Sequence, residues 1–230
     1  MYGRTTLADA PFAPNHPDYR ALESSFVRYP YDRRQAERLL ADLGYSKGAD
    51  GILIDGSGRR LVVEGRATAQ IESNVKALAA ISDFWQAVGV GVEQVVIPNQ
   101  RTSDREYRHS RPGFEVLPTP TGNNPDHFSY FHSSQVPLAS NNFVGFNRSR
   151  YSDEGLDALI DRYYATIPRA DRVEILRQIA RHITEQLAEM DLYFTTGHTF
   201  VGRRLRGVGG RALQATEVWN APEWTAGAML

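Results

Sequence analysis

The chain has 230 residues, of which 41% are hydrophobic and 23% charged, and its formal net charge is -1. These values are typical of a globular protein with one substantial core, and they give no electrostatic reason to expect nucleic acid or an anionic membrane as a partner. The absence of cysteine excludes disulfides, thiol nucleophiles and thiolate metal sites.

The first 30 residues lack hydrophobic periodicity and contain the prolines Pro11, Pro14, Pro17 and Pro30. We predict an extended connector over residues 1–30, and a disordered tail is the alternative. No stretch of the sequence is apolar over the length that a membrane-spanning helix needs.

A helix is predicted to start after Asp32, because Asp32 and Gln35 have the spacing of a capping box. Gly44 marks its end, since glycine adopts the left-handed conformation without a steric penalty. Strands over 52–54 and 61–64 are predicted to form a hairpin, because an Asp-Gly pair between apolar runs favours a tight turn.

The next segments alternate between helix and strand. A helix with an apolar stripe runs to Gly89, a buried strand rich in β-branched residues follows over 90–97, and a short helix over 103–109 leads to a strand at Phe114. This succession predicts an α/β fold with a mixed sheet that is flanked by helices.

Two consecutive helices follow the central loops, and Pro168 separates them. Ser152 is the predicted N-cap of the first helix, and the second is expected over 170–187. Further strands are expected near 192–195, 199–202 and 216–219.

Residues 113–146 are the most distinctive stretch of the chain. An apolar run enters a turn rich in glycine, proline and asparagine, and a short aromatic segment and a second polar loop follow. A strand that ends in a long polar loop is where an α/β domain usually presents a ligand surface. A solvated surface loop is the alternative.

Seven blocks follow one another along nearly the whole chain. They are YPYDRRQAERLLADLGY (29–45), DGILIDGSGRRLVVEG (50–65), the helix and strand over 74–97, NNPDHFSYFHSSQ (123–135), NNFVGFNRSRYSDEGLDALID (141–161), RADRVEILRQIARHITEQLAEMDLYF (169–194) and EVWNAPEW (217–224). In this order they resemble the family 5 extracellular solute-binding proteins, which are the dipeptide, oligopeptide and nickel-type receptors of ABC importers. The order and spacing of the blocks make the resemblance specific.

The resemblance implies the second lobe of a periplasmic-binding-protein type II (cluster C) fold, formed by the C-terminal part of such a receptor. It divides the chain into a connector from a missing N-terminal lobe (1–30), an α/β solute-binding lobe (31–202) and a C-terminal segment that returns to the missing lobe (203–230). Met1 is then expected to be an artificial start.

The same resemblance implies a non-enzymatic function. The lobe would bind a peptide-like or other small polar solute, close on it against the missing lobe and deliver it to an ABC permease. The implied location is the periplasm, or the cell surface for a lipoprotein. No cofactor and no metal are expected.

The resemblance also bears on the ligand. In peptide-binding members an acid ahead of the Pro-Asp-aromatic segment pairs with the peptide α-amine. Alignment on Pro125 and Asp126 brings the neutral Thr121 to that place. Loss of a charge-assisted hydrogen bond would cost about 1.5–3 kcal/mol of binding free energy, so a ligand other than a free-amine dipeptide is expected.

Four residues are the predicted ligand contacts. Arg66 lies close to the place where dipeptide receptors hold the carboxylate with an arginine, and an exposed arginine at a strand end is the alternative. Thr121, Asn123 and Asn141 lie in the two polar loops and would add neutral donors and acceptors.

The remaining patterns support other functions less well. His127 and His132, with Asp126 beside the first, are the close histidine cluster, and a hydrolase that uses them is the alternative hypothesis. Their spacing of five does not place both rings on one helix face, so an aromatic or surface role is the stronger interpretation. A structural or interaction domain without a small ligand is the third hypothesis.

Overall fold

The computed structural model describes residues 5–118, 125–195, 200–209, 218 and 220–227, and for 125–127 it gives the backbone alone. The chain forms two compact units. One, the helical unit, comprises Met1–Arg28, Pro120–Val136 and Ser149–Leu230; the other, the sheet unit, comprises Tyr29–Thr119 and Pro137–Arg148.

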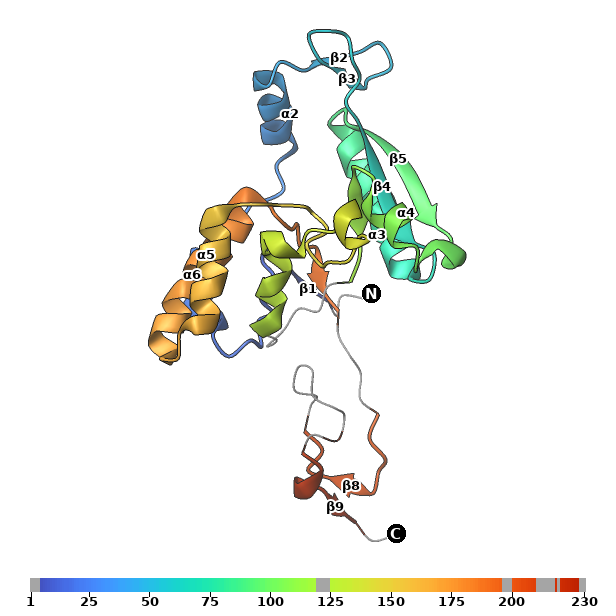
Figure 1. The fold of residues 1–230 in the computed structure, drawn as a ribbon. Helices are drawn as coiled ribbons and strands as arrows, with labels where there is room; N and C mark the ends of the chain where they lie inside the picture. The colour runs from blue at the N-terminus through green and yellow to red at the C-terminus, as the bar shows by residue number, and fades with distance from the viewer. Residues whose placement is uncertain (1–4, 119–124, 196–199, 210–217, 219, 228–230) are drawn as a thin grey trace. The chain divides into compact units, whose positions relative to one another are not determined.

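Helices and strands alternate through the middle of the chain, as Figure 1 shows. The α-helices are α1 (Tyr19–Leu22), α2 (Arg33–Asp42), α3 (Glu72–Ala87), α4 (Arg105–His109), α5 (Glu154–Ala165) and α6 (Arg169–Gln186). The strands are β1 (Thr6–Leu7), β2 (Ser46–Lys47), β3 (Leu53–Ile54), β4 (Val62–Thr68), β5 (Gly91–Ile97), β6 (Phe114–Val116), β7 (Tyr193–Phe194), β8 (Leu205–Arg206) and β9 (Thr225–Ala226). Short 3-10 helices cover Glu23–Ser25, Asn99–Arg101, Pro125–Phe131, Ser133–Gln135, Ala139–Asn141 and Ala221–Glu223.

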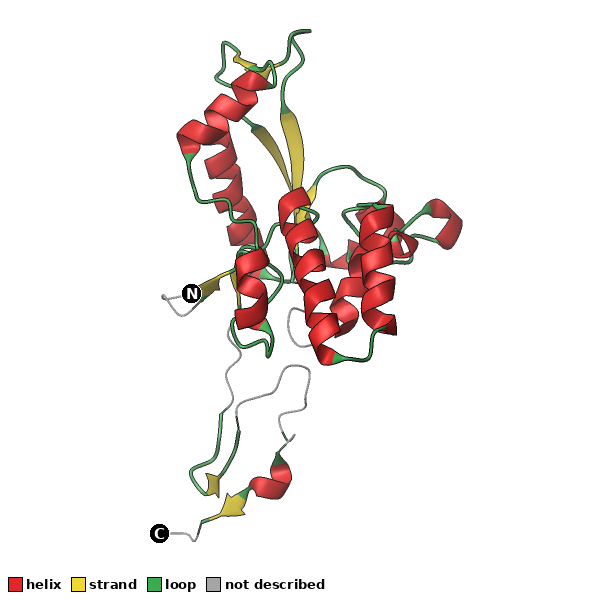
Figure 2. Cartoon of the chain, turned by 90° about the vertical axis from the view of Figure 1, so that its left-hand side faces the viewer, coloured by secondary structure: helices red, strands yellow, loops and turns green. Residues whose placement is uncertain are grey.

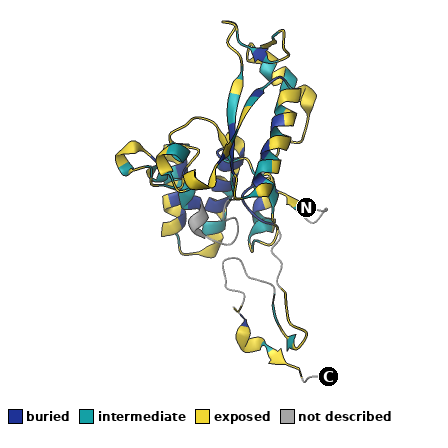
Figure 3. Cartoon of the chain, turned by 90° about the vertical axis from the view of Figure 1, so that its right-hand side faces the viewer, coloured by how far each residue is buried: buried dark blue, intermediate teal, exposed yellow. Residues whose placement is uncertain are grey.

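The sheet unit is built on a parallel three-stranded sheet with the order β5-β4-β6. Helix α3 is the crossover from β4 to β5 and packs on the sheet with its buried side, which carries Asn74, Leu78 and Ser82 (Figure 3). Gly65 of β4 makes this packing close, since a Cβ there would lie 2.7 Å from Leu78 Cδ1. The predicted α/β class is confirmed.

Two expectations about the strands need correction. The turn after β3 forms as predicted, with Asp55 N–H donating to the Arg59 carbonyl, but only the isolated bridge between Ile54 and Arg60 continues it. Strand β4 instead pairs in parallel with β5 and β6, while β3 pairs with β2. Strand β5 is not buried throughout: it lies at an edge of the sheet, and Ile97 and Gly91 are its buried residues.

The predicted helix ends are largely confirmed. The Asp32 carboxylate accepts a hydrogen bond from Gln35 N–H, and Gly44 and Gly89 follow α2 and α3 with φ of 88° and 96°. The predicted cap of α5 is wrong by one residue, because Asp153, and not Ser152, accepts from Leu156 N–H.

The helical unit has its core between α5, α6 and the N-terminal segment. Helices α5 and α6 lie side by side in Figure 2 and bury Leu156, Ile160 and Ile179. Residues 8–26 pack into this core, where an extended connector was predicted, and Phe12 and Leu22 are almost fully buried. The proposed division into lobes remains a prediction.

The C-terminal part of the chain contains the antiparallel pair β8–β9. The Asn220 side chain organises it: Nδ2 donates to the Gly207 carbonyl, and Oδ1 accepts from Trp224 Nε1–H. The strand predicted at 192–195 is present as β7, whereas 216–219 falls largely outside the described residues. The strand predicted at 199–202 is wrong for the described residues 200–202, which are irregular, and the next strand is β8. No helix among the described residues has the length and apolar character to cross a membrane.

Candidate functional site

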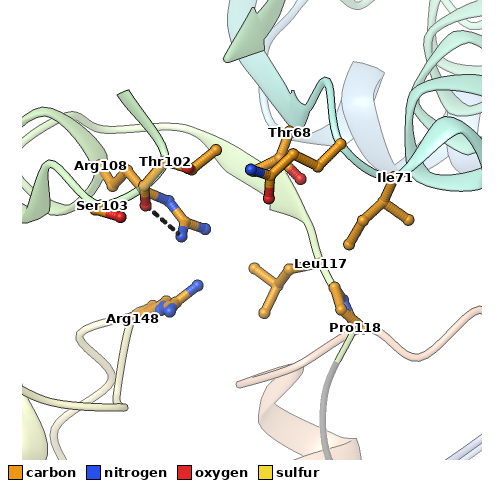
Figure 4. A pocket seen from close by; sticks show the side chains of 9 residues that line it. Thr68, Ile71, Thr102, Ser103, Arg108, Leu117, Pro118 and Arg148 are labelled. Carbon is orange, nitrogen blue, oxygen red and sulfur yellow. Dashed lines mark hydrogen bonds between the residues drawn. The ribbon is translucent and has the colours of Figure 1, made fainter. Parts of the chain in front are cut away.

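The sheet unit contains a cavity of about 360 Å³. Hydroxyl, amide and guanidinium groups dominate its lining, with a small apolar wall on one side (Figure 4). The lining residues are Thr68, Gln70, Ile71, Thr102, Ser103, Arg108, Leu117, Pro118 and Arg148.

The cavity lies at the carboxyl ends of the parallel strands. Thr68 is the last residue of β4, Thr102 and Ser103 follow β5, and Leu117 and Pro118 follow β6 directly. The carboxyl ends of parallel strands lie at one edge of a sheet, and ligands of open α/β sheets bind outside that edge. The position of the cavity is therefore that of a ligand site.

Arg108 is held at this edge by two contacts of its side chain. Its Nη2 forms an ion pair with Glu115 of β6, and its Nη1 donates to the Thr102 carbonyl over 3.3 Å. The ion pair is largely buried, with 14% of the Arg108 side chain and 12% of the Glu115 side chain exposed. Glu115 thus neutralises Arg108 and fixes its direction.

Arg66, a predicted ligand contact, supports the end of α4 and is not among the residues that line the cavity. Its side chain is 4% exposed, and Nη1 donates to the carbonyls of Tyr107 and Arg108 over 3.2 Å each. Its guanidinium carbon lies 4.7 Å from the centre of the Tyr107 ring, and Nε lies 3.2 Å from Glu64 Oε1. Carbonyls at a helix end have no partner within the helix, so Arg66 satisfies them and fixes the backbone of Arg108.

Arg148 reaches the cavity from the segment Pro137–Arg148. The ring of His109 connects this segment to α4, because the Phe143 carbonyl accepts a hydrogen bond from Nδ1–H over 3.0 Å. Asn147, the residue before Arg148, is 2% exposed and anchors the chain there. In Figure 4 the guanidinium groups of Arg148 and Arg108 extend into the same space.

Burial is the main cause of a lowered pKa at Arg148 and His109, and neighbouring charges have smaller effects of both signs. Removal from water lowers the pKa of Arg148, and the charge of Arg108 lowers it further. Burial also lowers the pKa of His109, with smaller contributions in the same direction from Arg148 and Arg108. The hydrogen bond to the Phe143 carbonyl and the charge of Glu115 act in the opposite direction and raise this pKa.

None of the other three predicted ligand contacts is found among the described residues that line the cavity. Thr121 and Asn123 lie outside the described residues. Asn141 accepts a hydrogen bond from Leu138 N–H through Oδ1, which caps a 3-10 helix, and it does not line the cavity. Contact of these residues and of Arg66 with a ligand stays a prediction.

The histidine cluster of the alternative hypothesis is described in part. His132 Nδ1 accepts from Ser134 N–H, and Nε2 lies 3.5 Å from Asp161 Oδ1. The side chains of Asp126 and His127 lie outside the described part of the chain. Within that part, no group of three histidine, aspartate or glutamate side chains is arranged to hold a metal ion.

Sequence reasoning missed Arg108, Arg148 and the hydroxyl groups beside them. The rule that ligands bind at strand ends could have found Thr68, Thr102 and Ser103, because each lies at or after the end of a predicted strand. It could not have found Arg148, which lies 30 or more residues from β6 and reaches the cavity through tertiary packing alone.

Comparisons with known proteins find similarity of structure only. No protein-family model matches the sequence, and no match is found among curated proteins. Solved structures match over most of the chain. One is NikZ from Campylobacter jejuni in complex with Ni(L-His), with a TM-score of 0.72 and 21% identity over 97% of this chain and 44% of that one.

Two further structures support the same fold. The oligopeptide-binding protein AppA from Bacillus subtilis, in complex with a nonapeptide, has a TM-score of 0.75 and 19% identity over 99% of this chain and 44% of that one. A periplasmic oligopeptide-binding protein from Thermotoga maritima, bound to mannohexaose, has a TM-score of 0.73 and 16% identity over 84% and 37%. The chain thus has the α/β fold found in part of these type II binding proteins, and it spans less than half of their length.

Proposed function

We propose that the chain is a ligand-binding lobe of a family 5 solute-binding protein, which delivers a peptide-like or other small polar solute to an ABC permease. One observation carries this proposal: a donor-rich cavity lies at the carboxyl ends of the parallel strands, in a fold shared with solved binding proteins. Those proteins are solved with a nickel complex, a nonapeptide and a mannohexaose, so the fold accommodates ligands of different chemistry.

The proposed lobe acts together with a second lobe. The solved proteins are more than twice as long as the matched part, and in the proposed receptor the two lobes close on the solute by a hinge motion. The closed form then docks on the permease at the outer face of the membrane, in the periplasm or on the cell surface.

Binding without chemical turnover is the property to test. The protein, with the second lobe that we propose for it, is titrated with a panel of peptides, sugars, organic acids and metal complexes, and heat release and the composition of the recovered solute are measured. The proposal expects saturable binding of at least one compound and its recovery unchanged. No binding across the panel, or conversion of the bound compound, would refute it.

The hydrolase alternative is separated by a variant. Replacing both His127 and His132 with alanine should leave solute affinity within about twofold, because the described one of the two, His132, lies in the helical unit and does not line the cavity. A compound that the native chain converts and the variant does not would establish the alternative.

A further inference from the structure

The positive charge in the cavity is only partly compensated. Arg108 is paired with Glu115, but no hydrogen bond or ion pair from the Arg148 side chain is present among the described residues. No acidic residue lines the cavity, so Arg148 adds a net positive charge to its wall.

The guanidinium groups of Arg108 and Arg148 extend into the same space, so their like charges repel each other. Burial lowers the pKa of Arg148, the charge of Arg108 lowers it further, and the charge of Glu115 offsets part of this effect. An anion placed between them would interact favourably with both and would remove the mutual repulsion. A cation would be repelled by both.

The remaining lining complements an anion. The Thr68 and Ser103 hydroxyls and the Gln70 amide are hydrogen-bond donors in the lining, whereas the Thr102 hydroxyl donates to the Asn99 carbonyl. Ile71 and Leu117 form the apolar side, which suits the carbon skeleton of a small organic molecule.

We propose that the cavity binds an oxyanion of the solute, a carboxylate or a phosphate group, between the guanidinium groups of Arg148 and Arg108. Arg148 is the specificity-determining residue, because its guanidinium lines the cavity and makes no hydrogen bond or ion pair with the described residues, although the charge of Glu115 acts on it from a distance. Arg108 supplies the second guanidinium group, and its ion pair with Glu115 fixes the orientation of that group. The proposal rests on the proposed function for the identity of the solute, but the anion site itself is a property of this chain.

The test uses the 230-residue chain and three simple probes. Acetate, inorganic phosphate and methylammonium are titrated at constant ionic strength, and the backbone amide shifts of residues 102, 103 and 117 are followed by NMR. Saturable shifts with acetate or phosphate, and none with methylammonium, are expected. Tighter binding of acetate assigns a carboxylate, and tighter binding of phosphate assigns a phosphate group.

A variant and a matched control complete the experiment. Arg148→Gln should weaken anion binding about tenfold or more, since it removes a charge-assisted hydrogen bond. Arg105→Gln makes the same charge change at an exposed position of α4 outside the cavity and should leave binding within about twofold. Equal effects of both variants, or the absence of saturable anion shifts, would overturn the proposal.

The outcome is independent of the proposed function. A recovered neutral solute whose affinity is unchanged in Arg148→Gln would leave the receptor function intact and overturn the anion site. Anion binding that depends on Arg148, in a protein that retains no solute, would support the site and count against the receptor.

Discussion

At the scale of single residues, Arg66 is a predicted ligand contact that instead supports the backbone of Arg108, a residue that lines the cavity. The sequence places an arginine near the end of a strand, and a family resemblance implies that it touches the ligand. The structure places its guanidinium under the carbonyls of α4, stacked on Tyr107 and beside Glu64. A pattern can locate such a residue, but the direction of its side chain depends on contacts more than 40 residues away.

The Arg66 network gives the first prediction. Arg66→Met should lower the free energy of unfolding by about 3 kcal/mol, because it leaves the Glu64 carboxylate without its buried partner. Urea unfolding measures the change. The double variant Arg66→Met/Glu64→Gln should recover part of the loss, and a loss below about 1 kcal/mol in the single variant would contradict the role given to Arg66.

A second residue-scale prediction concerns Asp191, next to β7. Burial and the nearby carboxylate of Glu189, with which it shares a hydrogen bond, raise the pKa of Asp191 well above its usual range. The folded state therefore binds a proton that the unfolded state has released, and the contribution of this group to stability falls as pH rises above its ordinary pKa of about 4.

Urea unfolding at about pH 5 and about pH 8 tests this sign. The native chain should lose stability between the two values, and Asp191→Asn should reduce the loss, because its amide cannot ionise. Asp171→Asn, at an exposed position of α6, is the matched control. A pH dependence that is the same in Asp191→Asn and in the native chain would contradict the prediction.

At the scale of elements, the sequence predicts helices better than strand partners. Helix signals are local: the cap at Asp32 and the glycine stops at Gly44 and Gly89 lie within a few residues of the helices they bound. Strand pairing is not local, so the pattern around 52–64 predicted a hairpin where β4 pairs in parallel with β5 and β6. The cavity depends on this pairing, so the sequence could point to the strand ends that line it but not to their meeting at one edge of the sheet.

The cap of α5 is an element-scale test. Asp153→Ala should lower the free energy of unfolding by about 1 kcal/mol, because Leu156 N–H loses its acceptor. Asp153→Asn keeps an acceptor at that position and should cost much less. Ser152→Ala should have little effect, and a larger loss in Ser152→Ala than in Asp153→Ala would restore the cap predicted from the sequence.

The entry to β6 gives another test. Gly113 has φ of 139°, and a Cβ there would lie 2.6 Å from the Glu64 carbonyl oxygen of β4. Gly113→Ala should cost about 1–3 kcal/mol of unfolding free energy, because the backbone of β4 has to move. Gly56→Ala, with no atom within 4 Å of the added Cβ, is the control, and equal stability of the two variants would contradict the close approach of these strands.

At the scale of the whole molecule, the fold class follows from local sequence patterns, whereas the two units and the cavity depend on tertiary packing. The succession of helices and strands predicted an α/β fold, and the order of sequence blocks resembled that of solute-binding proteins. Solved structures with TM-scores of 0.72 and 0.75 share the fold. The division into two units was not predicted, because each unit is assembled from segments that are separated in the sequence. The cavity has the same origin, since its wall combines strand ends with an arginine from a later segment.

The central claim is that this cavity is a ligand site of a solute receptor. Native mass spectrometry of the protein together with its second lobe, purified without unfolding, tests it most directly. We expect a stoichiometric small polar solute that carries an oxyanion and that is lost or depleted in Arg148→Gln but retained in Arg105→Gln. A protein that carries no solute in any preparation, or one whose solute is retained equally in both variants, would contradict the account.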